Sequence, residues 1–402
     1  MSVLRKNFTF KELNLYWHAL HHNIKRKTSV GTDKETKQKF ISELETRLHS
    51  ISREILRGEY QFSSLRPILI PKTSGGSRVI NVQTIRDRFV QRLIFQILIS
   101  KYEKKWKLPY SFSSMGGEST KEILVKLGTQ CTRDKWIIKT DISRYFDTID
   151  RAEMKRILHK EIRYTSLHKL LDQVVDCEHQ AHNSRDEKEI AAAGILKGKG
   201  LRQGMTLSPL FAYLFLRRED ERMPNGKYFR YVDDVVIIGD SRNEVEETFG
   251  ELRVLFKKRG LNLHDIGSPS SRPKTELIQP RNSFEFLGIG ISRKTDSIRF
   301  YVPNTVRAKI IEKIEKRADY KSLQKKEHRN WVGETSRYAS ELIQNYKSSY
   351  SFCENWNELE VMLRERQSYL ANKITTTLSE LAVTPRTPEA QYTLLKLFGI
   401  HK

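Results

Sequence analysis

Apolar residues recur along this chain at two spacings, one typical of helices and one typical of strands. The first 60 residues predict helices, and within 37–56 four apolar side chains lie about one helical turn apart: Phe40, Leu44, Leu48 and Ile51. Residues 86–106 show the same spacing and predict a longer helix. From residue 304 onward the chain has a helical pattern and is rich in Lys and Arg. Helices are therefore expected on both flanks of the chain.

Strand-like segments lie between these helices. Residues 65–80 predict a hairpin with a Gly-rich turn, residues 136–141 predict a single strand, and residues 283–302 predict a further β pair. A polar helical region at 151–195 interrupts the strands. Strands enclosed by helices in this way predict an α+β core with helical extensions.

Three further features lie in the centre of the chain. Residues 200–204 form a Gly-rich turn that leads into an apolar helix. Residues 228–238 predict a second hairpin, whose tip carries two acidic residues. Ser241 and Glu244 have the spacing of a capping box and predict the start of another helix.

The charge, the cysteine content and the lack of long apolar runs limit the classes of protein to which the chain can belong. The 72 Lys and Arg outnumber the 49 Asp and Glu among 402 residues, which leaves a formal charge of +23 and indicates a polyanionic partner such as nucleic acid. Three widely spaced cysteines argue against a disulfide framework and favour a reducing cytoplasm. The first residues lack the pattern of a secretory signal, and no apolar run approaches the ~18 residues of a membrane span. These observations exclude a secreted or transmembrane protein but leave both an enzyme and a passive RNA binder open.

Three aspartates are the strongest candidates for chemistry. Asp141 ends a predicted strand, and Asp233 and Asp234 occupy the tip of a predicted hairpin. Mg²⁺ prefers oxygen ligands and usually takes one or two carboxylates, with water and phosphates completing its shell. The alternative is that the Asp pair only supplies turn residues. Two adjacent like charges between apolar strands are costly without a cation, and this favours the metal site.

Four motifs in one order resemble those of reverse transcriptases. Tyr231-Val-Asp-Asp234 is similar to their Y-x-D-D motif, and the segment from Asp141 to Asp147 is similar to their first palm motif. Residues 203–209 match Q-G-x-x-x-S-P, and residues 65–91 resemble the fingers motifs of bacterial, group II intron-like enzymes. The resemblance implies an α+β right-hand polymerase. Its expected parts are a helical basic extension (1–60), fingers (61–135), a palm (136–300) that contains a helical insertion (151–195), and a helical thumb with a C-terminal extension (301–402).

The resemblance also implies roles for individual residues. Two Mg²⁺ ions, with Mn²⁺ as a substitute, are expected at a site formed by Asp141, Ile142, Asp233 and Asp234. Phe146 aligns with the gate that rejects a ribose 2′-OH, although an ordinary core aromatic is the alternative. The expected nucleotide-binding residues are Lys72, Arg78, Arg144, Tyr145, Phe146, Gln203, Gly204 and Lys274. The expected primer grip is Phe286, Leu287 and Gly288.

Departures from the family pattern suggest a subgroup. The segment 110–117 lacks the Arg-Pro of intron enzymes, and the V-T-G tripeptide of retron enzymes is absent. By elimination the chain resembles the defence-associated bacterial reverse transcriptases, which implies a noncoding RNA template, dNTPs, a DNA product and a cytoplasmic location, with room for an oligomer or a second subunit. The open alternatives are a template-independent or protein-primed polymerase, a silent RNA-binding scaffold, and a retron-type or intron-derived enzyme.

A zinc site is the other metal hypothesis. Cys177, His179 and His182 are close in sequence, but a structural zinc site needs a fourth ligand and none is near. Surface or core positions are the better interpretation of these three residues.

Overall fold

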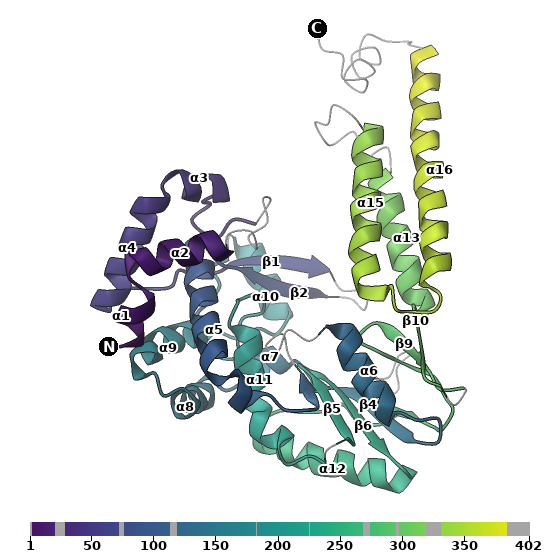
Figure 1. The fold of residues 1–402 in the computed structure, drawn as a ribbon, viewed down its shortest axis with the longest axis horizontal. Coiled ribbons are helices and arrows are strands. Elements are labelled where there is room, and N and C mark those ends of the chain that lie inside the picture. The colour runs from purple at the N-terminus through teal and green to yellow at the C-terminus, as the bar shows by residue number, and fades with distance from the viewer. Residues whose placement is uncertain are drawn as a thin grey trace. The chain divides into compact units, whose positions relative to one another are not determined.

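The computed structural model describes residues 2–20, 29–71, 76–112, 119–181, 183–224, 226–267, 274–294, 297–318 and 331–383. These residues group into two compact units (Figure 1). Unit 1 comprises residues 1–118 and 137–277, and unit 2 comprises residues 119–136 and 278–402. The four-part division expected from the sequence stays a prediction, since compact units and functional domains need not coincide.

Unit 1 begins with a helical layer. Its helices are α1 (Val3–Asn7), α2 (Phe10–Leu20), α3 (Lys37–Ser42) and α4 (Leu44–Arg57). The buried rings of Trp17 and Phe40 pack 4.9 Å apart, and Phe89 of α5 (Ile85–Trp106) meets Trp17 edge-on at 5.4 Å. This aromatic cluster fastens the N-terminal helices to the long helix α5.

A two-stranded hairpin follows the helical layer. Its strands β1 (Arg66–Pro71) and β2 (Ser77–Val82) pair antiparallel in the register Ile70 to Arg78. Lys72, which follows β1 in the sequence, lies outside the described residues. The predicted hairpin at 65–80 is confirmed.

A five-stranded sheet forms the core of unit 1. Its strands lie in the order β3-β5-β6-β4-β7, and β5 pairs antiparallel with β6. Apolar residues of β6 from Val235 to Ile238 are buried, because the sheet is covered by helices such as α12 (Arg242–Lys258), which packs on β6 (Figure 1). The strands are β3 (Ser111–Phe112), β4 (Trp136–Asp141), β5 (Tyr228–Tyr231), β6 (Asp234–Gly239) and β7 (Glu276–Ile278).

Helices connect and cover these strands. The region expected to be helical at 151–195 forms several short helices rather than one. The apolar helix predicted after residue 204 is confirmed as α11 (Ser208–Asp220). The remaining helices of unit 1 are α7 (Tyr145–Thr148), α8 (Arg151–Glu161), η2 (Thr165–Leu167), α9 (His168–Asp176), α10 (Ser184–Ala192) and α12 (Arg242–Lys258).

Unit 2 combines a small sheet with long helices. Its sheet has the order β10-β9-β8, with both neighbouring pairs antiparallel. The predicted β pair at 283–302 is therefore a three-stranded meander. The elements are α6 (Thr120–Gln130), β8 (Phe284–Phe286), β9 (Ile289–Ser292), β10 (Arg299–Tyr301), α13 (Asn304–Ala318), α15 (Trp331–Tyr350) and α16 (Trp356–Val383).

Two local predictions differ from the structure. The helix expected at 37–56 is interrupted at Glu43, whose φ of −117° lies outside the helical range. The Ser241 hydroxyl accepts from the Glu244 amide as a capping box requires, but the Glu244 carboxylate accepts from the Asp240 amide and from Lys227 instead of returning to Ser241.

No helix among the described residues is both long enough and apolar enough to cross a membrane.

Candidate active site

The candidate catalytic residues lie at neighbouring strand ends in the five-stranded sheet. Asp141 ends β4, and β6 is the neighbouring strand. The amide of Ile142 donates to the carbonyl of Asp233 at 2.9 Å, so the hairpin turn and the end of β4 are directly connected. Tyr231 pairs with Asp234 across the hairpin. The end of β4 and the turn before β6, about 90 residues apart in the sequence, therefore lie side by side, and the catalytic role of their three aspartates stays a prediction.

The turn between these strands has an unusual backbone. Val232 has φ of +57°, in the left-handed region that a β-branched residue rarely adopts. Arg230 Nη1 donates to the Val232 carbonyl at 2.7 Å and stabilises this backbone conformation. Arg230 is itself fully buried, and its guanidinium is paired with the carboxylate of Asp220 at the end of α11. A buried ion pair thus supports the strained turn that carries the acidic residues.

The local electrostatics are unfavourable to three charged carboxylates. Burial raises the pKa of Asp233 above its ordinary value and the charge of Asp141 raises it further, while Arg78 and Lys274 act in the opposite direction. Burial and the charges of Asp233 and Asp141 raise the pKa of Asp234 to about 6. The site therefore favours an added positive charge.

Asp141 makes few polar contacts of its own. Lys274 Nζ lies 3.2 Å from its Oδ2, and His264 Nε2 lies 3.9 Å from its Oδ1, beyond hydrogen-bond range. Oδ1 is buried and has no hydrogen-bond partner within the described part of the chain. A buried carboxylate oxygen without a donor is costly, and a metal ligand is one explanation for it.

These features fit divalent cations. The donors are carboxylate oxygens, the ligand type that Mg²⁺ and Mn²⁺ prefer. Within the described ranges, no group of three or more His, Cys, Asp or Glu side chains is arranged to hold a metal ion. Mg²⁺ commonly takes one or two carboxylates and completes its shell with water and phosphates, so the carboxylates of Asp141 and Asp233 are of the ligand type that such an ion accepts.

The three basic residues that are expected to bind the triphosphate differ in where they lie. Arg78 is exposed on β2, and its charge acts on Asp233. Lys274 is exposed beside Asp141. Lys72 lies outside the described residues, so its placement stays a prediction.

Residues 144–146 follow the strand end at Asp141. Arg144 has φ of +50° and its guanidinium donates to the Gly194 carbonyl. Phe146 is half-buried, and its expected role at the ribose stays a prediction. Tyr145 is only 2% exposed, and its hydroxyl donates to the carbonyl of Ala212. The expected nucleotide contact of the Tyr145 side chain does not fit this burial, and we assign it to packing.

The turn at Gln203 and Gly204 is fixed against β2. The Gln203 carbonyl accepts from the backbone amide of Asn81 at 2.7 Å and from its side chain at 3.2 Å. Gly204 has φ of +100°, and a Cβ there would lie 2.5 Å from the Asn81 carbonyl oxygen. Only glycine fits this position, because both the dihedral angle and the space exclude a side chain.

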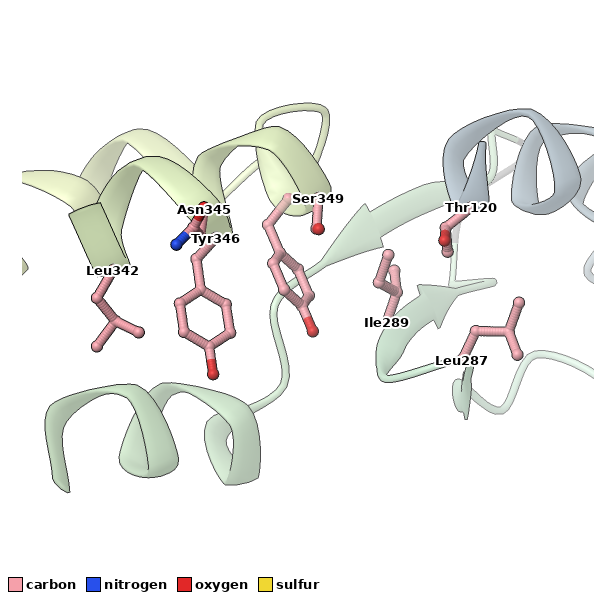
Figure 2. A pocket seen from close by; sticks show the side chains of 8 residues that line it. Thr120, Leu287, Ile289, Leu342, Asn345, Tyr346 and Ser349 are labelled. Carbon is pink, nitrogen blue, oxygen red and sulfur yellow. The ribbon is translucent and has the colours of Figure 1, made fainter. Parts of the chain in front are cut away.

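The expected primer grip lies in unit 2, at the turn between β8 and β9. Phe286 is buried, while Leu287 (φ +50°) and Gly288 (φ +75°) form the turn. The Gly288 carbonyl lies 3.4 Å from the Tyr350 hydroxyl of α15. A pocket of about 400 Å³ adjoins this turn and is lined by Thr120, Leu287, Ile289, Leu342, Asn345, Tyr346, Ser349 and Tyr350. Figure 2 shows the side chains around it. Polar and aromatic groups beside this turn are compatible with a nucleic-acid strand, and the assignment stays a prediction.

Sequence reasoning missed several residues that support the site. Asp220 and Arg230 form the ion pair below the hairpin turn, and Asn81 holds the Gln203 turn. A charged residue within the apolar run Tyr228-Phe-Arg-Tyr231 was the available signal for a buried partner. The zinc hypothesis gains no support: Cys177 is buried, and His182 lies outside the described residues.

Residues 70–291 match the family model described as reverse transcriptase (RNA-dependent DNA polymerase), and the match covers more than half of the chain. The chain belongs to this family. The reverse transcriptase match confirms the predicted class of enzyme, an RNA-directed DNA polymerase, and the α+β right-hand polymerase fold.

Relatives of this reverse transcriptase chain include proteins named for introns. It is 26% identical over 311 residues to Protein YkfC of Escherichia coli, covering 66% of this chain and 76% of that protein. It is 26% identical over 183 residues to a putative COX1/OXI3 intron 2 protein of Saccharomyces cerevisiae, covering 44% of this chain and 20% of that protein. The chain thus spans about a fifth of the length of the yeast relative. These matches confirm the predicted resemblance to bacterial and intron-like reverse transcriptases.

Among solved structures, apo telomerase from Candida tropicalis is similar over 84% of this chain and 68% of that one, with 14% identity and a TM-score of 0.44. A second telomerase structure from the same organism, in complex with a fragment of telomeric RNA, has a TM-score of 0.42 at 14% identity and covers 88% of this chain and 68% of that one.

Proposed function

We propose that this reverse transcriptase extends a primer on an RNA template by a mechanism that uses two divalent cations, Mg²⁺ or Mn²⁺. Asp141, Asp233 and Asp234 would hold the ions. The observation that supports the proposal is the backbone bond from Ile142 to Asp233, which joins the end of β4 to the turn before β6, the two segments that contain these aspartates. The chemistry that such ions supply is activation of the attacking hydroxyl and neutralisation of charge on the leaving pyrophosphate.

The chain's own residues would bind and orient the nucleotide. Arg78 offers a planar fork of donors to the triphosphate. Lys274 would exchange its contact with Asp141 for a phosphate oxygen when the nucleotide enters. Phe146 would exclude a ribose 2′-OH, and Gln203 with Gly204 would form the floor below the incoming base.

The test is incorporation of dTTP on poly(rA) primed with oligo(dT), with Mg²⁺ present. Asp233→Asn is expected to lower incorporation by about a thousandfold, because several kcal/mol of charge stabilisation is lost. Glu251→Gln, an exposed acidic residue on α12, is the matched control and should retain full activity. Equal activity of wild type and Asp233→Asn would overturn the assignment.

The same assay separates the alternatives. Synthesis without template would favour a template-independent or protein-primed polymerase. RNA binding without incorporation by the wild-type chain would favour a silent scaffold.

We further propose that the natural template is a structured noncoding RNA and that the chain serves bacterial antiphage defence in the cytoplasm. This part is supported by the missing Arg-Pro and V-T-G segments together with the excess of 23 positive charges. Sequencing the nucleic acid that copurifies with the chain tests it: one RNA species with complementary DNA is expected. Intron or retron RNA would instead assign the chain to those groups.

A further inference from the structure

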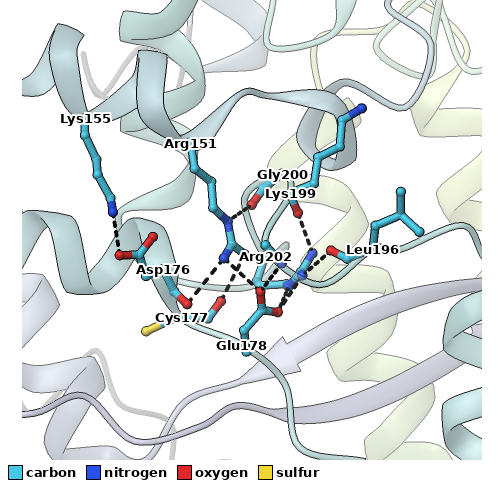
Figure 3. Close-up of polar contacts among 10 residues, drawn as sticks. Arg151, Lys155, Asp176, Cys177, Glu178, Leu196, Lys199, Gly200 and Arg202 are labelled. Carbon is cyan, nitrogen blue, oxygen red and sulfur yellow. Dashed lines mark hydrogen bonds and ion pairs between the residues drawn. The ribbon is translucent and has the colours of Figure 1, made fainter.

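A carboxylate outside the catalytic strands organises a second polar cluster in unit 1. Glu178 accepts from two arginines (Figure 3): Arg151 Nη1 donates at 2.8 Å, and Arg202 donates through Nε at 3.0 Å and Nη2 at 2.5 Å. The backbone amide of Gly198 also donates to Glu178, at 2.8 Å. Arg202 is 1% exposed, so this is a built, largely buried arrangement.

The same arginines bind the backbone of the loop at 196–202. Arg202 donates to the carbonyls of Leu196 at 2.7 Å and Lys199 at 3.1 Å. Arg151 Nε donates to the carbonyl of Gly200 at 2.8 Å. Together with the Gly198 amide, four backbone groups of a short Gly-rich segment are fixed by three side chains. A segment rich in glycine is otherwise free to adopt many conformations.

This loop leads directly into the Gln203 turn. The hydroxyl of Ser208 donates to the Arg202 carbonyl at 2.9 Å, so both ends of the turn are held. On its other side the Gln203 carbonyl accepts from Asn81 of β2. The placement of Gln203 and Gly204 therefore depends on the loop before them.

The Glu178 segment also contacts the fingers hairpin. The amide of Leu65, just before β1, donates to the Glu178 carbonyl at 2.8 Å, and the Gln180 amide donates back to the Leu65 carbonyl at 2.8 Å. One short segment thus connects the start of the hairpin that carries Arg78 with the loop that precedes Gln203.

The charge balance of the cluster is favourable. Burial alone would raise the pKa of Glu178, but the Gly198 amide and the Arg202 guanidinium hold it below its ordinary value. The carboxylate is therefore ionised and paired at neutral pH, and its charge offsets that of the two arginines.

We propose that Glu178, Arg151 and Arg202 are positioning residues for the incoming nucleotide: they hold the loop at 196–202 so that Gln203 and Gly204 keep their place against β2. The inference rests on the proposed function. None of the three side chains acts on the reacting atoms; they act through the backbone of the loop.

The test measures kcat and the KM for dTTP on poly(rA)/oligo(dT) with the full chain. Glu178→Gln keeps the size of the side chain but removes its charge, and is expected to raise the KM for dTTP about tenfold with kcat changed much less, because a displaced binding surface weakens binding first. Arg202→Lys keeps the charge but loses the fork of donors, and should show a smaller rise in the KM.

The matched control is Asp176→Asn, which removes the neighbouring ion pair with Lys155 that Figure 3 also shows. The Asp176 side chain is exposed and pairs with Lys155 rather than with the loop, so both kinetic constants should stay at their wild-type values. Hydrogen exchange gives a readout independent of activity: the Gly198 amide should exchange faster in Glu178→Gln, while the strand amides of β6 should not.

The outcomes separate this inference from the proposed function. An inactive wild-type chain would refute the function. An active wild type with an unchanged KM and unchanged Gly198 exchange in Glu178→Gln would overturn only the positioning role. If Glu178→Gln fails to fold, the KM for dTTP of Arg202→Lys decides whether the positioning role holds. If neither variant folds, the inference is overturned and the cluster is assigned to the stability of the core alone.

Discussion

The buried pair of Asp220 and Arg230 allows stability and activity to be separated. Asp220 Oδ1 accepts from Arg230 Nε at 2.9 Å and from the Tyr228 hydroxyl at 2.7 Å, and Oδ2 accepts from the Ser111 hydroxyl at 2.7 Å. Arg230 also holds the Val232 carbonyl of the hairpin turn. The pair therefore has a structural role and, through Val232, a role at the candidate active site.

The expected loss in the free energy of unfolding follows from the burial of both partners. Asp220→Asn leaves a fully buried guanidinium without its countercharge, which costs about 3–5 kcal/mol. Arg230→Met leaves a buried carboxylate and should cost a similar amount. The double variant buries no charge, and its free energy of unfolding should fall by less than that of either single variant. Against a total stability of about 5–15 kcal/mol, these differences are large.

Urea denaturation of the four proteins, followed by far-UV circular dichroism, measures the coupling between the two residues. Reverse transcription on poly(rA)/oligo(dT) is then measured for the folded variants. The double variant should be stable yet at least about tenfold slower than wild type, because the Val232 carbonyl has lost its donor and a small displacement of catalytic groups is costly.

Glu219→Gln is the matched control. Glu219 precedes Asp220 on α11, is also buried, and pairs with Arg259 at 2.9 Å away from the turn. It should lose stability without a specific loss of turnover. Additive losses of stability in the double variant would refute the pairing argument, and full activity of a stable double variant would refute the role of Arg230 at the turn.

Three further predictions address the nucleotide site and the RNA. Gly204→Ala should abolish or strongly reduce incorporation, since its Cβ would lie 2.5 Å from the Asn81 carbonyl at a φ of +100°; single-nucleotide extension measures this, and wild-type rates would contradict it. Tyr145→Phe should lower the free energy of unfolding by about 0.5–1.5 kcal/mol, seen in the urea midpoint, and leave the KM for dTTP unchanged, because its hydroxyl bonds to Ala212; a raised KM would restore the nucleotide contact. RNA affinity should fall steeply with salt, with log K losing about 0.7–0.9 per phosphate neutralised for each tenfold rise in salt; filter binding at several salt concentrations measures the slope, and a flat response would exclude phosphate contacts as the main source of affinity.

The parts of the site that the sequence predicted are those whose signals are local. Asp141 ends an apolar strand, and Asp233 and Asp234 lie between two apolar strands, so each pattern is readable within about ten residues. The hairpin at 65–80 and the helix after Gly204 follow from the same short-range rules. The structure added the contact between them, the bond from Ile142 to Asp233.

The residues that the sequence did not predict act through contacts without a local pattern. Arg151, Glu178 and Arg202 come from three separate segments, and nothing in their spacing indicates that they meet. Tyr145 and Phe146 are adjacent aromatic residues, and only the packing of α7 decides which one is buried. Which residues meet and which ring is buried depend on tertiary contacts, and no short segment of the sequence has a pattern that predicts those contacts.

Two of the buried arginines among the described residues share a physical arrangement. Arg230 and Arg202 are both almost fully buried, and both are paired with a carboxylate. Arg230 donates to a carbonyl of the turn that carries Asp233, and Arg202 donates to carbonyls of the loop that precedes Gln203. An ion pair in the interior adds little net stability compared with apolar residues. A guanidinium, however, can hold a carboxylate and a carbonyl at the same time with fixed geometry. We infer that the cost of burying these charges is offset by the fixed conformation of two turns, which an apolar side chain has no donors to hold.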